Sequence, residues 1–278
     1  MRSKFIGLLM VPFLLCGCTE KVQKMHQDHL VAKIITTDKV EDIETELAQI
    51  DENTLVVFDC DGVLVANTIQ IMKKKNREMS RKLFEKYMGK SDVTEVLSIM
   101  VSSGQGQLVN NKMPILVKNL QDKNIRVVVL TGFSASPFGH IKDPKVWRTD
   151  NLNSFGYHFE KSWPNTPQKK FSTSSAFYKG VIFCGDLSKD VCLNKFIAHS
   201  GMRPKKIIFI DDGIGNIHDV AEYCKSDGIQ FVGIEYLEAE KIVPNFPFSE
   251  KTAEFQFRTL KDKGIWLSDE EAAKAVVR

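Results

Sequence analysis

The amino-acid sequence predicts an α/β protein with a doubly wound, Rossmann-like parallel sheet and helices on both faces. Continuous apolar runs rich in β-branched residues are typical of strands buried on both sides, and they cover 54–58, 125–130, 181–184, 207–210 and 229–234. Apolar residues at helical spacing separate most of these runs, at 114–120, 191–198 and 217–224. Strands that alternate with helices indicate a parallel sheet covered on both faces.

The N-terminus has the pattern of a secretion signal over residues 1–17. Arg2 and Lys4 precede an apolar run, 5–15, that is too short to span a bilayer. The sequence LCGC at 15–18 resembles the bacterial lipobox, so Cys18 is the expected lipidated residue. A plain secretory leader cleaved nearby is the alternative. The lipobox reading predicts a lipoprotein of the bacterial envelope, anchored in a membrane and facing the periplasm.

The rest of the chain divides into a tether and one folded domain. Residues 18–38 are polar and mixed and are expected to form the tether, which leaves 39–278 for the domain. Apolar residues at helical spacing predict a helix over 40–50. Residues 68–103 are charged and Met-rich and predict a small helical cap inserted after the first strand of the domain. Residues 133–179 are rich in Pro, Gly, Ser and aromatics and predict a second, loop-rich insertion or a small β-type excursion.

Charge and cysteine content exclude some classes of function. The net charge is +3, and loss of Arg2 and Lys4 with the leader lowers it to 3 − 2 = +1, so no nucleic-acid-binding face is expected. Four cysteines remain after the leader, and they show no zinc or disulfide-scaffold spacing; they are Cys60, Cys184, Cys192 and Cys224. Buried free thiols are the favoured interpretation, and disulfides stay open.

Acidic residues follow two of the predicted strands. Asp59 and Asp61 come directly after the first apolar run, and Asp211 and Asp212 come directly after the fourth. Carboxyl ends of neighbouring parallel strands share one edge, so we expect these carboxylates to meet there. Such a cluster requires a cation, and oxygen-only ligands favour Mg²⁺. Asp-x-Asp-Gly also opens EF-hand loops, but a strand precedes it here and the later ligands of that loop are missing.

Two further features lie between the acidic pairs. Thr131 and Gly132 follow the second apolar run and place a hydroxyl at a strand end. Lys189 lies near the start of a helical segment, with Lys179 and Lys195 as rival lysines.

These motifs, in this order, resemble a known superfamily. Asp59-x-Asp61-Gly62-Val63, Thr131-Gly132, Lys189 and Asp211-Asp212 are similar to the four signature motifs of the haloacid dehalogenase (HAD) superfamily of phosphatases and phosphotransferases. The resemblance runs from about residue 55 to residue 216. Segments 180–186, 189–197 and 204–212 resemble, more narrowly, a little-characterised family of bacterial envelope proteins within that superfamily.

The resemblance implies a role for each motif. Asp59 would be the nucleophile that forms an aspartyl-phosphate, and Asp61 would protonate the leaving oxygen and then activate water. Mg²⁺ would be held by Asp59, Asp211 and the backbone carbonyl of Asp61, with Asp212 binding through water or positioning Lys189. Phosphoryl oxygens would be bound by Thr131, Gly132 and Lys189.

The predicted function is therefore a magnesium-dependent phosphomonoesterase acting on a small-molecule phosphate ester. The acid at Asp61 favours phosphate chemistry, because the dehalogenase branch lacks an acid at that position. A non-catalytic metal-binding envelope protein and a sugar phosphomutase are the alternatives. Substrate identity, oligomeric state and the choice of inner or outer membrane are not predicted.

Overall fold

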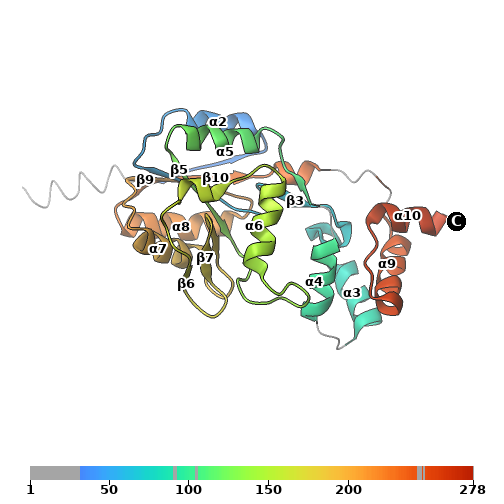
Figure 1. Cartoon of the computed structure of the whole chain (residues 1–278). Helices are drawn as coiled ribbons and strands as arrows, with labels where there is room; N and C mark the ends of the chain where they lie inside the picture. Colours follow the sequence, from blue (N-terminus) through green and yellow to red (C-terminus); the bar gives the residue numbers. More distant parts are fainter. Residues whose placement is uncertain (1–31, 90–92, 104–105, 243–245, 247, 278) are drawn as a thin grey trace, which may run out of the picture.

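The computed structural model describes residues 32–89, 93–103, 106–242, 246 and 248–277 (Figure 1). The predicted signal peptide, the lipidation site Cys18 and most of the predicted tether lie outside these residues. The main sheet contains β1 (Lys33–Thr37), β2 (Thr54–Phe58), β5 (Arg126–Thr131), β6 (Lys169–Lys170), β7 (Ala176–Tyr178), β8 (Val181–Phe183), β9 (Lys206–Asp211) and β10 (Gln230–Tyr236). A separate two-stranded ribbon pairs β3 (Val65–Asn67) with β4 (Gly106–Leu108).

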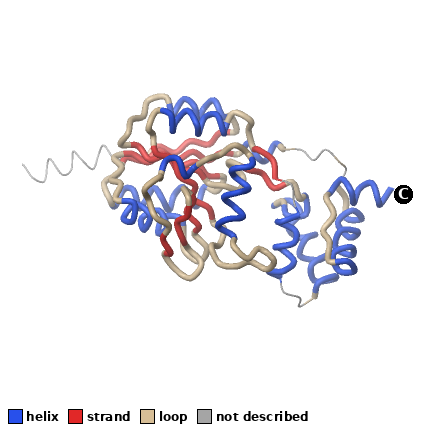
Figure 2. The backbone as a smooth tube through the Cα atoms, in the orientation of Figure 1, coloured by secondary structure: helices blue, strands red, loops and turns tan. Residues whose placement is uncertain are grey.

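The strand order of the main sheet is β1-β10-β9-β2-β5-β8-β7-β6. The first six strands in this order are parallel, and β7 and β6 add an antiparallel edge. Figure 2 shows the strands of the sheet in red with helices around them. Parallel neighbours require crossover connections, and helices supply them between β2, β5, β9 and β10. The structure therefore confirms the α/β prediction with a mostly parallel sheet.

Helices occupy both faces of this sheet and a region beside it. Their bounds are α2 (Val40–Leu47), α3 (Arg77–Met88), α4 (Val93–Ser103), α5 (Met113–Asp122), α6 (Pro144–Ser154), α7 (Lys189–Ser200), α8 (Ile214–Ser226), α9 (Glu250–Lys263) and α10 (Asp269–Val277). None of the helices in the described part of the chain has both the length and the apolar character needed to cross a membrane.

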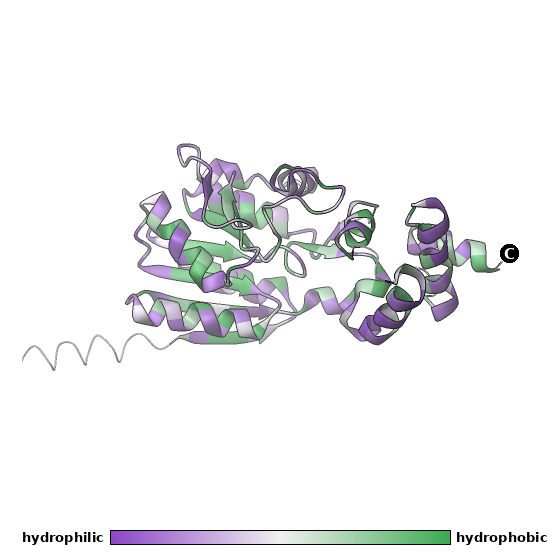
Figure 3. Ribbon diagram, turned by 90° about the horizontal axis from the view of Figure 1, so that it is seen from below, coloured by the Kyte–Doolittle hydropathy of each residue, from purple (hydrophilic) through white to green (hydrophobic). Residues whose placement is uncertain are grey.

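Alternate residues of the central strands enter two separate cores. Val56 and Phe58 of β2 pack with the apolar faces of α2 and α5, whereas Leu55 and Val57 pack with α7 and α8. Successive strand residues point to opposite faces, so a strand covered on both sides must be apolar throughout. Figure 3 shows this hydrophobic character along the central strands.

The tether prediction is wrong at its C-terminal end. Residues 33–37 form β1, which pairs in parallel with β10 and closes one edge of the sheet. The β-branched residues of this segment, Ile34, Ile35, Thr36 and Thr37, favour a strand. The residues that precede β1 in the sequence are polar and mixed, so composition alone does not mark where the strand begins.

The stretch 133–179 contains more regular structure than its composition predicts. It includes the helix α6 and the short antiparallel strands β6 and β7. Asp143 caps α6 by accepting hydrogen bonds from the backbone N–H groups of Lys145 and Val146, and Pro144 occupies the first turn. This helix carries Arg148, whose side chain contacts Asp61.

Four helices form a separate layer, which we call the cap: α3, α4, α9 and α10. Phe257 of α9 lies 5.7 Å from Phe84 of α3 and 5.4 Å from Trp266, measured between ring centroids. Val96 and Met100 of α4 belong to the same apolar cluster. Both α3 and α4 fall within the stretch predicted to form a cap, but the pairing with the C-terminal helices was not predicted. Figure 1 shows the cap to one side of the sheet.

Candidate active site

Two adjacent strands bring the acidic residues together. β2 and β9 are parallel neighbours with Phe58 paired to Ile210, and the N–H of Asp59 donates a 2.8 Å hydrogen bond to the carbonyl of Ile210. Asp59 and Asp211 therefore leave the sheet at the same carboxyl edge. The edge of a doubly wound sheet at the carboxyl ends of its strands is the usual place for a ligand.

Three carboxylates form a compact group at this edge. Asp59, Asp211 and Asp212 each offer an oxygen, and these oxygens all lie within 4.8 Å of one another. Asp211 is fully buried and Asp59 is 6% exposed. Oxygen ligands with this spacing and burial suit a hard divalent cation such as Mg²⁺. The group can therefore hold a metal ion.

Lys189 lies between two of these carboxylates. Its Nζ is 2.6 Å from Asp59 Oδ1 and 2.6 Å from Asp211 Oδ2, and its side chain is 8% exposed. Lys189 begins α7, whose N-terminus faces this edge, whereas Lys195 is exposed further along the same helix. Lys179 occupies the turn between β7 and β8 in a left-handed backbone conformation. Of the three lysines considered from the sequence, only Lys189 contacts the carboxylates.

Burial and charge act in opposite directions on these groups. Burial raises the pKa of Asp59 to about 7, although the positive charge of Lys189 opposes the rise; Asp211 adds to it. Burial alone would lower the pKa of Lys189, but the charges of Asp59 and Asp211 outweigh it and hold this pKa above its ordinary value. Lys189 is thus a fixed positive charge, and Asp59 is a carboxylate whose ionisation depends on its neighbours.

Asp211 is oriented by donors on the following turn. Its Oδ1 accepts hydrogen bonds from the N–H of Gly213 at 2.8 Å and from Asn216 Nδ2 at 2.9 Å. The other oxygen, Oδ2, is the one that contacts Lys189. Both oxygens are engaged, so the carboxylate has a fixed orientation. Asn216 is therefore a positioning residue of the site that the sequence motifs do not include.

Thr131 ends β5, the other neighbour of β2. Its hydroxyl is buried and accepts a 3.1 Å hydrogen bond from the N–H of Phe133. A hydroxyl that accepts one bond still has its own proton to donate, so Thr131 can bind a phosphoryl oxygen. A side chain added at Gly132 would meet no atom within 4 Å, so the backbone is open at this position.

A tight turn carries Asp61 out of the sheet edge. Gly62 has φ +96°, and its N–H donates to the carbonyl of Val65 at 2.8 Å. A Cβ at Gly62 would lie 2.8 Å from Asp212 Oδ2, so only glycine allows this approach. The side chain of Asp61 is half exposed, unlike that of Asp59.

Arg148 is a site residue that the sequence did not indicate. Its Nη2 donates to Asp61 Oδ2 at 3.0 Å, and its side chain is only 6% exposed. The guanidinium lies 4.8 Å from the centre of the Phe133 ring and 5.0 Å from that of Trp147, while Nε is buried without a hydrogen-bond partner. Arg148 thus holds Asp61 from an element, α6, that was not predicted. The Asp143-Pro144 pair was the available signal for a helix start.

The four cysteines of the described domain are all free and buried, as the sequence indicated. Cys60 lies between Asp59 and Asp61, where burial raises the pKa of its thiol well above the ordinary value. It is therefore a protonated, packed side chain rather than a nucleophile.

Comparison with known proteins places the chain in a group of bacterial proteins. Residues 36–273 match the DUF2608 family, described as a protein of unknown function. An uncharacterised protein of Rickettsia prowazekii is 24% identical over 87% of this chain and 91% of its own length. A Chlamydia trachomatis protein named "Putative outer membrane protein" is 25% identical over 73% of this chain and 76% of its own. A crystal structure of a HAD-superfamily hydrolase from Ehrlichia chaffeensis aligns with a TM-score of 0.35 and 14% identity, covering 63% of this chain and 86% of that one.

Proposed function

The chain belongs to the DUF2608 family, and we propose that it is a magnesium-dependent phosphohydrolase that acts through an aspartyl-phosphate at Asp59. One observation carries the proposal: three carboxylates from two adjacent strand ends lie within 4.8 Å of one another, with Lys189 between two of them. Burying several carboxylates and an ammonium costs desolvation free energy, so such a cluster contributes little to the stability of the fold. The same groups can bind a divalent ion and a phosphate, which favours a functional role.

Asp59, Asp211 and Asp212 would hold the ion. When bound, Mg²⁺ shields the anionic nucleophile from the anionic phosphate and stabilises charge on the phosphoryl oxygens. The remaining positive charge comes from the chain itself. Lys189 and the hydroxyl of Thr131 donate to phosphoryl oxygens and orient the phosphorus toward Asp59.

Two displacements at phosphorus complete the reaction. In the first, a carboxylate oxygen of Asp59 forms a bond to phosphorus, the ester P–O bond breaks, and Asp61 gives its proton to the departing oxygen. In the second, Asp61 takes a proton from water, the water oxygen attacks phosphorus, and the bond to Asp59 breaks with release of inorganic phosphate. Arg148 keeps Asp61 in place through both steps.

Hydrolysis of p-nitrophenyl phosphate tests this function. We expect turnover by the leaderless protein that requires Mg²⁺ and falls by a factor on the order of 10³ or more in Asp59→Asn. Asp262→Asn, a change at an exposed acid on α9, is the matched control and should keep full activity. Acid-quenched wild type should carry a phosphoryl group on the peptide that contains Asp59.

The two alternative functions, a non-catalytic metal-binding protein and a phosphomutase, predict different results in the same experiment. Wild type and Asp59→Asn that are equally inert over a broad panel of phosphate esters would refute the phosphohydrolase and favour a non-catalytic metal-binding protein. Transfer of the phosphoryl group to a sugar phosphate in preference to water would instead indicate a phosphomutase.

We also propose that the protein works in the bacterial envelope, lipid-anchored through Cys18. The leader pattern supports this location, as do chlamydial relatives that carry the name "Putative outer membrane protein". Metabolic labelling with a fatty acid should mark the full-length chain and should be abolished by Cys18→Ser but not by Cys16→Ser. Labelling that survives Cys18→Ser would refute this attachment site.

A further inference from the structure

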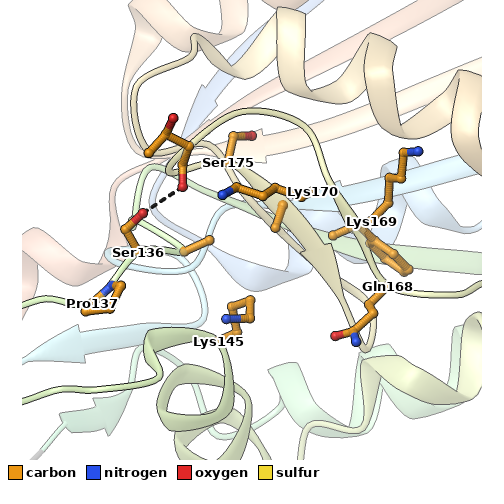
Figure 4. Close-up of a pocket in the computed structure, with 11 residues that line it drawn as sticks. Ser136, Pro137, Lys145, Gln168, Lys169, Lys170 and Ser175 are labelled. Atoms are coloured by element: carbon orange, nitrogen blue, oxygen red, sulfur yellow. Dashed lines mark hydrogen bonds between the residues drawn. The ribbon is translucent and has the colours of Figure 1, made fainter.

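A concave site lies between the loop after β5, the start of α6 and the β6–β7 hairpin, and its lining shares no residue with the acidic edge (Figure 4). Its volume is about 480 Å³. The lining includes three lysines and several hydroxyls but no carboxylate, with Ser136, Lys145, Lys170 and Thr173 among the polar residues. We call it the basic pocket. Its composition is opposite to that of the acidic site.

The lysines of the basic pocket are only partly neutralised. Lys145 Nζ is 2.9 Å from Asp143 Oδ1, but Lys170 forms no ion pair with any residue in the described part of the chain. In Figure 4 the side chain of Lys170 extends toward Ser136, whose hydroxyl donates to the carbonyl of Thr173 at 2.7 Å. An ammonium beside hydroxyls, with no acid in the lining, is an arrangement that binds phosphate or another anion.

The same elements build the basic pocket and the proposed active site. The loop that contributes Ser136 follows directly from Thr131 at the end of β5. On α6, Lys145 and Arg148 are three residues apart and therefore lie on neighbouring positions of one helix face. A ligand that spans the two sites would thus contact one continuous set of elements.

Sheet geometry gives the separation of the two sites. The basic pocket includes Ser175 and Ala176, at the end of β7 that adjoins the carboxyl end of β8. The strand order β2-β5-β8-β7 puts β7 three strands from Asp59. At about 4.8 Å per strand, the two sites are roughly 10–15 Å apart. That span is suitable for the two ends of a small metabolite.

We propose that the basic pocket binds a second phosphate group of a substrate whose scissile phosphate lies at Asp59. This inference rests on the proposed function, and it narrows the substrate class to phosphate esters with a remote anionic group. Simple monophosphates would be poorer ligands, because they leave the basic pocket empty. The two charged ends would also fix the orientation of the substrate along the sheet edge.

Binding of non-hydrolysable probes tests the inference without requiring catalysis. An alkanediyl bisphosphonate with its phosphonates about 10–15 Å apart and an alkylphosphonate of the same chain length would be titrated calorimetrically into the Mg²⁺-loaded protein. We expect Lys170→Glu to weaken bisphosphonate binding by about tenfold or more and to leave alkylphosphonate binding unchanged. Lys170→Gln should give an intermediate loss. An ω-carboxyalkylphosphonate shows whether a carboxylate can replace the second phosphate.

Lys195→Glu is the matched control, because it reverses the charge of an exposed residue on α7 that does not line the basic pocket. Equal bisphosphonate affinity in wild type and Lys170→Glu, or no binding to wild type, overturns the inference even if p-nitrophenyl phosphate is hydrolysed. Bisphosphonate binding that depends on Lys170 in a protein without hydrolytic activity supports the anion site and refutes the proposed function alone. Thermal unfolding of both variants checks that each is folded.

Discussion

At the acidic edge, Asp59 and Asp211 are the tips of adjacent parallel strands, whereas the cap joins α3 and α4 to helices from the far end of the chain. The acidic edge combines buried charges of opposite sign around Lys189. The cap has an apolar cluster of its own, centred on Phe257, with aromatic partners from α3 and from the segment after α9. Electrostatics dominates one region and apolar packing the other.

The two regions are therefore destabilised by different kinds of substitution. Buried ion pairs contribute little net stability while intact, but removal of one partner is costly because the other charge stays buried. An apolar cluster responds instead to lost volume. The two regions should therefore respond to different substitutions.

Lys189→Met should have the largest effect on stability. It leaves Asp59 and Asp211 as like charges without the cation between them, so we expect the unfolding free energy in metal-free buffer to fall by about 3–5 kcal/mol. Urea denaturation measures this change. Mg²⁺ should restore part of the loss, because an ion that binds the native state stabilises it. Lys195→Met should change the free energy by less than about 0.5 kcal/mol, and equal losses in the two variants would contradict the electrostatic description.

Phe257→Ala should destabilise the cap by about 3 kcal/mol through the cavity it creates. Hydrogen exchange should increase in α3 and α9 while the amides of β2 and β9 keep their protection, since the apolar cluster of the cap contains no residue of those strands. Phe255→Ala, at a less buried position of the same helix, is the control. Faster exchange throughout the sheet would show that the two regions unfold as one unit.

Arg148→Lys should lower kcat by about 10- to 100-fold with little change in KM, because an ammonium cannot both donate to Asp61 and stack on the rings of Phe133 and Trp147 as the planar guanidinium does. Arg126 offers a matched control: it also stacks on an aromatic ring, that of Trp163 at 5.0 Å, but it lies away from Asp61. Arg126→Lys should leave kcat unchanged. Partial rescue of Arg148→Ala by methylguanidinium would support the positioning role, and a change confined to KM would contradict it.

The raised pKa of Asp59 should make magnesium affinity depend on pH. Protons compete with the ion below pH 7, so the apparent affinity should fall by up to about tenfold per pH unit there and level off above it. In the metal-free protein, the free energy of unfolding should change with pH in the opposite direction. A carboxyl group whose pKa is raised in the folded state stabilises the fold at low pH, and this contribution is lost as pH rises through about 7. Asp59→Asn should abolish the stability trend, and a trend that persists in this variant would assign it to other groups.

The acidic edge was predictable because its signals are local. Each uninterrupted apolar run marks a buried strand, and Asp59 and Asp211 follow such runs directly, so their approximate positions follow from parallel pairing. Lys189 was singled out by its place in the order of motifs. Ser268 and Glu271 at the start of α10 are likewise a local pattern, a capping box in which the N–H of each residue donates to the side chain of the other.

The parts that were missed depend on contacts between distant segments. The sequence of α9 does not indicate that its apolar face packs on α3 rather than on the sheet. The spacing of apolar residues shows that a helix has a buried face, but it does not identify the element that covers this face. Arg148 is one arginine in a stretch rich in loop-forming residues, and its contact with Asp61 requires the folded path of the whole loop after β5. The basic pocket combines three such segments and has no sequence motif of its own.

Lys189 also affects the order in which the molecule can be assembled. Its ammonium neutralises the tips of β2 and β9 from within the chain, so the sheet can close before any divalent ion is present. Under the proposed function, loading with Mg²⁺ would then be an exchange of partners in a folded protein and not the event that drives folding. A chelator should accordingly abolish the activity of such a protein while leaving it folded and able to bind Mg²⁺ again.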